Sequence, residues 1–261
     1  MPGQLPRCAG RAKLTFMPTR AVHLVIDAAD PSRLASFWAA ALDWHVTDDE
    51  PDEADVEPAG FDYPGPAALP LVFIRVPEPK VTKNRIHLDL ATRSAEHQAA
   101  EVDRLLALGA VRVDIGQGQV PWEVMADPEG NEFCVLEPRD IYLNATPVAA
   151  VVVDSADPSS AARFWAAAAG WTPHESGPDF ASLREPGGIG PFLEFLRVTD
   201  AKTVKNRVHI DVAPPPGGDV GTEVQRLVLA GAAAADVGQS DVQWVVLADP
   251  EGNEFCVLTP R

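Results

Sequence analysis

Residues 121–139, PWEVMADPEGNEFCVLEPR, recur almost unchanged as residues 243–261, QWVVLADPEGNEFCVLTPR. Fifteen of the nineteen positions are identical, at an offset of 122 residues. A second pair of segments supports the repeat, because residues 27–44 match residues 154–171 at twelve of eighteen positions, at an offset of 127. This period exceeds the roughly 20–50 residues of solenoid repeats, so each copy is expected to be a complete domain.

The repeats set the expected domain boundaries. Residues 21–139 are predicted to form the first domain and residues 148–261 the second, joined by a linker over residues 140–147. Residues 1–20, which hold four basic side chains and no acid, are predicted to be a disordered basic tail. Two copies in one chain resemble a covalently joined homodimer, so a pseudo-twofold arrangement is expected, in a monomer or in a homodimer.

The composition is that of a folded, acidic protein. Of the 261 residues, 46% are hydrophobic and 23% are charged. The net charge is −17 and the tail contributes +4, so the other residues carry −17 − 4 = −21. An acidic body repels nucleic-acid phosphates, so nucleic acid is not an expected partner. No apolar run approaches the roughly 18 residues that span a membrane, so a membrane is not an expected partner either. Seven acids within residues 48–57 are predicted to form a solvated, mobile loop.

The cysteines indicate a reducing compartment. Cys8, Cys134 and Cys256 are an odd and sparse set that provides no disulfide framework, so a cytoplasmic location is expected. The sequence contains no glycine-rich dinucleotide motif, no P-loop and no nucleophile elbow.

Within each copy, the expected succession of strands and helices itself repeats. Residues 21–27 alternate as in a strand, and Asp30 followed by Pro31 predicts the start of an amphipathic helix. The order restarts with a strand over residues 85–91 and a helix capped by Ser94, followed by further strands. Each half of a copy is therefore predicted to be a β-α-β-β-β module.

Strand alternation assigns side chains to faces. Ile86, Leu88 and Leu90 are predicted to pack on helices, and His87 and Asp89 to lie on the opposite face. The same rule predicts that Val22, Leu24 and Ile26 face the helices. It places His23, Val25 and Asp27 on the second face. The second faces of the first domain are predicted to form a cup around one shared hollow, which holds His23, His87, Asp89, Glu132 and Cys134.

These segments resemble the vicinal oxygen chelate superfamily, and the glyoxalase-like domain proteins most of all. The resemblance rests on HLVIDAADPSRLASFW (23–38), on KNRIHLDL (83–90), which returns as KNRVHIDV (205–212), and on the DPEGNEF stretch. The superfamily includes glyoxalase I, extradiol dioxygenases, bleomycin-resistance proteins and methylmalonyl-CoA epimerase. The resemblance implies an α+β fold of two tandem glyoxalase-like domains, each of paired βαβββ modules whose curved mixed sheets form open cups.

The resemblance also implies a metal site in domain one. Three of the positions that hold ligands in metal-using members carry His23, His87 and Cys134 here, and the remaining one matches Ile74 or a neighbour. Zinc, iron, manganese and nickel are the candidate metals. Glu132 and Asp89 are then the candidates for moving protons. In domain two the matching residues are Ala150, Leu196, His209 and Cys256. Since isoleucine cannot bind metal, a centre with four protein ligands is incomplete.

Structural roles explain some of the same residues. His209 recurs where other ligands are missing, which favours a hydrogen bond to a neighbouring Asp or Arg for it and for His87. A strand cysteine is commonly a small buried hydrophobe, and Glu132 is expected to pair with Arg85. His23 is absent from the second copy, where Ala150 replaces it, so it is the better candidate for a function confined to one site.

Three functions fit these observations. One is an enzyme with metal-dependent lyase, isomerase or dioxygenase chemistry on a small oxygen-rich metabolite in domain one. Another is a metal-free small-molecule binding protein of the bleomycin-resistance kind. The third is a pseudoenzyme scaffold. A fold does not choose among them, and the sequence leaves open whether the protein is an enzyme at all.

Overall fold

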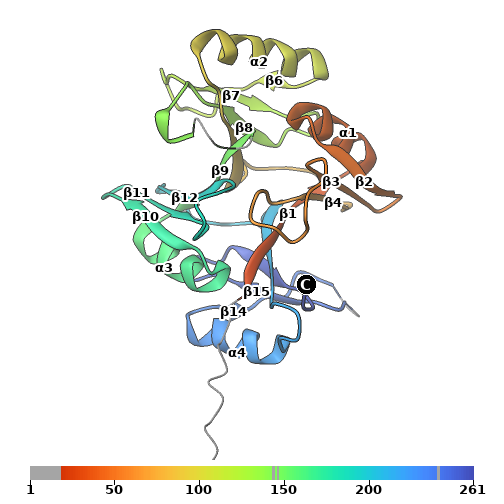
Figure 1. Cartoon of the computed structure of the whole chain (residues 1–261), viewed down its shortest axis with the longest axis vertical. Coiled ribbons are helices and arrows are strands. Elements are labelled where there is room, and N and C mark those ends of the chain that lie inside the picture. The colour runs from red at the N-terminus through yellow and green to blue at the C-terminus, as the bar shows by residue number, and fades with distance from the viewer. Residues whose placement is uncertain (1–18, 143–144, 146, 240–241) are drawn as a thin grey trace, which may run out of the picture.

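The computed structural model describes residues 19–142, 145, 147–239 and 242–261 (Figure 1). The first repeat contains β1 (Arg20–Ala28), α1 (Pro31–Leu42), β2 (His45–Glu50), β3 (Glu53–Glu57), β4 (Leu71–Arg75), β5 (Ile86–Leu90), α2 (Ala95–Leu108), β6 (Val111–Arg112), β7 (Glu123–Ala126) and β8 (Glu132–Val135). A short 3-10 helix, η1 (Asp140–Tyr142), follows within the linker region. The second repeat contains β9 (Val148–Ser155), α3 (Pro158–Ala169), β10 (Thr172–Ser176), β11 (Phe180–Arg184), β12 (Phe192–Arg197), β13 (Val208–Ala213), α4 (Val220–Leu229), β14 (Ala233–Ala234), β15 (Val245–Ala248) and β16 (Glu254–Val257).

The predicted β-α-β-β-β order is confirmed four times. We number these modules along the chain: β1–β4 is module 1, β5–β8 is module 2, β9–β12 is module 3 and β13–β16 is module 4. The acids over residues 48–57, predicted as a loop, instead form the β2–β3 hairpin, where buried Ala54 and Val56 alternate with acids. Most of the predicted tail, and three positions of the predicted linker, lie outside the described residues.

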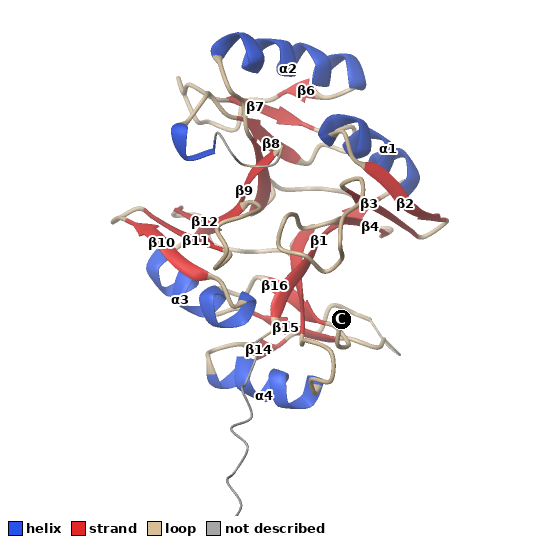
Figure 2. Cartoon of the chain, viewed as in Figure 1, coloured by secondary structure: helices blue, strands red, loops and turns tan. Residues whose placement is uncertain are grey.

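Each sheet combines one module from each repeat (Figure 2). Sheet A has the order β14-β15-β16-β13-β1-β4-β3-β2, so it joins module 4 to module 1. Sheet B has the order β10-β11-β12-β9-β5-β8-β7-β6, so it joins module 3 to module 2. The joining pairs are antiparallel: β1 lies beside β13, with Leu24 opposite Ile210, and β5 lies beside β9, with Leu88 opposite Val151.

This pairing overturns the expectation of one shared hollow inside domain one. The first strand of module 1 pairs with module 4, and the first strand of module 2 pairs with module 3. β1 and β5 therefore belong to different sheets, although both lie in the first repeat. Because a strand side chain can line only the faces of its own sheet, each hollow takes its residues from both repeats.

The predicted apolar face is largely confirmed. Ile86, Leu88 and Leu90 are at most 3% exposed and belong to the main core with the helices. Leu24 and Ile26 belong to the same core. Val22 differs from its prediction. A β-bulge between Ala21 and His23 shifts the register, so Val22 packs on the opposite face with Ala213 and Cys256.

The helix ends follow the sequence signals. The Asp30 side chain accepts a hydrogen bond from the Arg33 amide at 3.2 Å, with Pro31 as the first helical residue of α1. Ser94 caps α2, and Gly109 ends it in the left-handed conformation at φ 107°. Among the described residues, no helix is both long enough and apolar enough to cross a membrane.

The DPEGN segment holds the two sheets of a repeat together. The Asp127 carboxylate accepts bonds from Trp38 Nε1 at 3.1 Å, from the amides of Glu129 and Asn131 at 2.9 Å, and from Asn131 Nδ2 at 2.9 Å. Gly130 takes the positive φ of 85° that this turn requires. Trp38 lies on the helix of module 1 and Asp127 in module 2, so the motif ties sheet A to sheet B. The second repeat copies this arrangement in full.

We expect Asp127→Ala to lower the free energy of unfolding by about 3 kcal/mol or more, because it strands several buried donors at once. Denaturant unfolding followed by circular dichroism measures the change, and Asp103→Ala, an exposed position on α2, is the matched control. A loss as small as that of the control would contradict the assigned role of the motif.

Candidate functional site

Cup A is the face of sheet A that turns away from the helices, and four polar side chains gather there: His23, His209, Asp211 and Cys256. His209 Nε2 lies 3.4 Å from Asp211 Oδ1, and His23 Nδ1 lies 3.7 Å from Asp211 Oδ2. Cys256 Sγ lies 3.6 Å from His209 Nε2. The sheet register explains this grouping, since Asp211 on β13 is opposite both His23 on β1 and Cys256 on β16.

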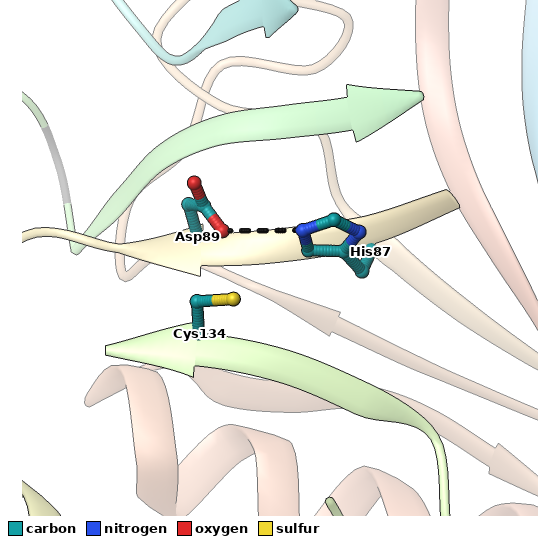
Figure 3. A group of neighbouring side chains, drawn as sticks. All are labelled: His87, Asp89 and Cys134. Carbon is teal, nitrogen blue, oxygen red and sulfur yellow. Dashed lines mark ion pairs between the residues drawn. The ribbon is translucent and has the colours of Figure 1, made fainter. Parts of the chain in front are cut away.

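Cup B is the equivalent face of sheet B, with His87, Asp89 and Cys134 in the corresponding places (Figure 3). His87 Nε2 lies 3.4 Å from Asp89 Oδ1. Asp89 is directly opposite Cys134 on the neighbouring strand β8. Each cup therefore contains a His-x-Asp pair from one strand and a cysteine from the next.

The predicted set of His23, His87 and Cys134 does not converge. His87 and Cys134 lie in cup B, whereas His23 lies in cup A beside His209. The cause is the pairing of β1 with β13 described above. His23 thus completes the site of the second repeat's His209, a partnership that the sequence-based grouping missed.

The other predicted site residues separate in the same way. Asp89 faces cup B, but both Glu132 oxygens have partners, with Lys80 Nζ at 2.7 Å and the Asn84 amide at 3.1 Å. The expected pairing of Glu132 with Arg85 is wrong, because Arg85 lies 3.7 Å from Glu251. These contacts favour a structural role for Glu132.

The second ligand position also differs from its assignment. Val25 is opposite Val72 on β4, and the equivalent Val152 is opposite Glu194 on β12. His209 is in register with Val25 and therefore with Val72, and His87 is in register with Val152 and therefore with Glu194. Ile74 and Leu196 are not in register with these histidines. Cup A therefore has no carboxylate at this position, and cup B has one.

The linker packs into cup B. Tyr142 of η1 is 5% exposed and donates a hydrogen bond to Glu194 Oε1 at 2.6 Å. Its ring packs edge-to-face on Phe192 at a centroid distance of 5.5 Å. Burial raises the pKa of Glu194. With Ala150 at the place of His23, cup B keeps a single histidine of its cluster and a carboxylate already engaged by a phenol.

Burial and neighbouring groups shift the pKa values of Asp211 and Cys256 in cup A. Burial alone raises the pKa of Asp211, but the neighbouring His209 and His23 imidazoles outweigh it and hold that pKa below its usual value. Burial, reinforced by Asp211, raises the pKa of the Cys256 thiol far above its ordinary range. The cup thus holds a carboxylate and, without a cation, a protonated thiol.

Two further residues of cup A escaped the sequence analysis. Asp55 on β3 lies in the same row as Val72, Val25 and His209, and burial, followed by the charge of Glu53, raises its pKa to about 6. The Tyr63 ring stacks on His23 at a centroid distance of 5.2 Å. Asp55 Oδ1 and Tyr63 Oη are both buried without a hydrogen-bond partner. The alternation of acids with Ala54 and Val56 was the available signal for this strand.

The donors of cup A fit a tetrahedral metal ion. Metal bonds of 2.0–2.3 Å imply donor separations of roughly 3.3–3.8 Å in a tetrahedron. The separations of His209 Nε2 from Asp211 Oδ1, 3.4 Å, and from Cys256 Sγ, 3.6 Å, fall in this range and exceed the 2.7–3.2 Å typical of N–H···O hydrogen bonds. His23 Nδ1 lies 3.7 Å from the other carboxylate oxygen, Asp211 Oδ2. The donors of His209, Asp211 and Cys256 all lie within 4.8 Å of one another, and Asp211 Oδ1 is buried without a hydrogen bond.

The comparisons with known proteins agree on the fold. Maize (Zea mays) glyoxalase I is similar, with a TM-score of 0.61, 15% identity and 92% of each chain covered. The V278E variant of the same enzyme gives a TM-score of 0.63 with the same identity and coverage. A candidate dioxygenase from Bacillus subtilis has a TM-score of 0.60 and 13% identity, with 93% of this chain and 86% of that chain covered. Identities this low support the fold alone.

No curated protein matches the chain in sequence. The sequence model described as "glyoxalase-like domain" matches twice, over residues 23–136 and over residues 150–258. The two matches cover most of the chain and coincide with the two internal repeats. This chain therefore belongs to the glyoxalase-like domain family and carries two copies of the domain.

Proposed function

We propose that cup A binds a divalent metal ion and is the working site of a metal-dependent enzyme for a small, oxygen-rich metabolite. One observation carries the proposal: His23 from the first repeat and His209 from the second converge on Asp211 beside Cys256. No other group of described residues brings two histidines, a carboxylate and a thiol together.

The donor set favours zinc among the candidate metals. Imidazole and thiolate ligands suit zinc, whereas iron and manganese sites more often use carboxylates. When bound, the metal would polarise adjacent oxygens of the substrate as a Lewis acid. This assignment favours isomerase or lyase chemistry, in which protons move, over dioxygenase chemistry.

Asp55 is the proposed proton carrier. Its pKa of about 6 keeps a share of both protonation states near neutral pH, as a general acid or base requires. The unpartnered Tyr63 hydroxyl, beside His23, supplies a hydrogen-bond donor at the same edge of the cup. We therefore assign to Asp55 in cup A the proton-carrying role that the sequence predicted for Asp89 in domain one. Cup B then has a structural role.

We expect His23→Ala and His209→Ala each to weaken zinc binding at least about tenfold, because each removes a ligand. Isothermal titration of the metal-stripped chain with ZnCl₂ measures this, and His87→Ala, the cup B counterpart of His209, is the control. If wild type binds no zinc, or if His87→Ala weakens binding as much as the two cup A variants do, the proposal fails.

Zinc binding should strengthen as the pH rises from about 6 to 8. The raised pKa of Cys256 means that metal must displace a thiol proton, so protons are released on binding. Titration in buffers of different ionisation enthalpy counts these protons. Cys256→Ser should flatten the pH dependence and Cys134→Ser should not; an unchanged slope in Cys256→Ser would remove the thiol from the ligand set.

The buried Asp55 carboxyl should destabilise the fold at neutral pH. Its pKa rises from 3.8 to about 6 on folding, so the folded chain binds this proton more tightly and stability falls as the pH rises through that interval. Asp55→Asn should therefore raise the melting temperature at about pH 7.5 and change it little at about pH 4. Exposed Glu50→Gln is the control. Equal effects at both pH values would refute the burial of an ionisable Asp55.

A further inference from the structure

Tyr142 lies in cup B although it comes from outside the repeated modules. It is the last residue of η1, and it belongs to the apolar cluster that lines the cup. Its backbone is held on both sides, since its amide donates to the Arg139 carbonyl at 2.9 Å and its carbonyl accepts from the Ala145 amide at 2.9 Å. Ala149 and Ala150, both fully buried in the same cluster, are small enough to leave room for the ring.

The Tyr142 hydroxyl is bonded within the row of residues that contains His87. It donates to Glu194 Oε1 at 2.6 Å. Glu194 on β12 is opposite Val152 on β9, and Val152 is opposite His87 on β5. Side chains in register across a sheet share one face, so the phenol group lies on the same face of sheet B as His87. The tyrosine therefore occupies the interior of the cup.

Glu194 is a carboxylate that the fold does not require. Its counterpart in cup A is Val72, which is 5% exposed and pairs with β1 in the same register. Burial raises the pKa of Glu194, because a carboxylate out of water costs free energy unless a donor is bonded to it. An acid retained at such a cost is typical of a functional site. In this chain the donor is the phenol group of Tyr142.

Two further side chains make contacts that are specific for an aromatic ring. The Phe192 ring meets the Tyr142 ring edge-to-face at a centroid distance of 5.5 Å, and the Arg139 guanidinium lies 5.9 Å from the Tyr142 centroid. Arg139 is fixed in turn by Glu137 at 2.8 Å and by the Trp122 ring at 5.7 Å. Edge-to-face and cation–π contacts favour a flat ring over an aliphatic chain. Cup B thus offers an acceptor for a hydroxyl and a wall for a ring.

We propose that cup B is a binding site for a small phenol, and that Tyr142 occupies this site as a tethered ligand. The hydroxyl of a free phenol would donate to Glu194, and its ring would lie against Phe192 and Arg139. The structural role of cup B then holds only while Tyr142 stays in place. The inference goes beyond the proposed function, because it concerns the other cup and involves no metal.

The test uses p-cresol, which reproduces the tyrosine side chain, and toluene, which is the same molecule without the hydroxyl. Isothermal titration is run on the full metal-stripped chain, so that zinc binding in cup A does not enter the comparison. A tethered ligand leaves the site open in only a fraction of the molecules, so we expect Tyr142→Ala to bind p-cresol at least about tenfold tighter than wild type. In that variant p-cresol should bind at least about fivefold tighter than toluene, because only p-cresol donates to Glu194.

Three more variants locate the binding. Glu194→Val, added to Tyr142→Ala, copies the Val72 of cup A and should abolish the preference for p-cresol over toluene. Ile141→Ala changes the neighbouring residue of η1, which is 40% exposed, and should bind p-cresol as weakly as wild type. Tyr142→Phe keeps the ring and loses only the hydroxyl, so it should bind p-cresol with an intermediate affinity. Circular dichroism checks each fold, and Tyr142→Phe decides the test if Tyr142→Ala does not fold.

Three results would each overturn the inference. The first is that neither Tyr142→Ala nor Tyr142→Phe binds p-cresol more tightly than wild type does. The second is that p-cresol and toluene bind Tyr142→Ala equally well. The third is that Glu194→Val leaves the preference for p-cresol unchanged, since the hydroxyl would then be recognised elsewhere.

Discussion

The antiparallel pairing of β1 with β13, and of β5 with β9, determines the chemistry of this chain. Each pair joins a strand of one repeat to a strand of the other, and a backbone edge left unpaired in the interior would be costly. Cup A consequently takes His23 from the first repeat and His209 from the second. Neither repeat holds the complete cluster by itself.

Much of this fold was predictable from the sequence. The duplication indicated four modules, alternation placed His87 and Asp89 opposite Leu88, and local signals located the caps at Asp30 and Ser94. The pairing of modules was not predictable. Because the two repeats share their hydrophobic pattern, β1 fits β5 and β13 equally well in that pattern, and only the path of the intervening chain decides between them.

The two cups show how copies of one domain diverge. Recurring residues outside the His-Asp-Cys clusters, such as Asp127 with Asp249 and Glu132 with Glu254, make the same structural bonds in both repeats. The cups differ at several positions: Ala150 stands for His23, Glu194 stands for Val72, and the linker supplies Tyr142 to cup B. The sequence signalled the His23 difference but not its partner, and it gave no sign that the linker enters cup B.

The acidic surface contributes to the site as well as to solubility. Asp55 lies within the β2–β3 hairpin, and the neighbouring Glu53 adds to burial in raising its pKa to about 6. The acids of the hairpin therefore help to retain a proton near neutral pH, which a lone carboxyl in water would lose. The same negative field would repel an anionic ligand, so recognition of an acid requires local positive charge. A metal held among His23, His209 and Cys256 would provide such charge in cup A.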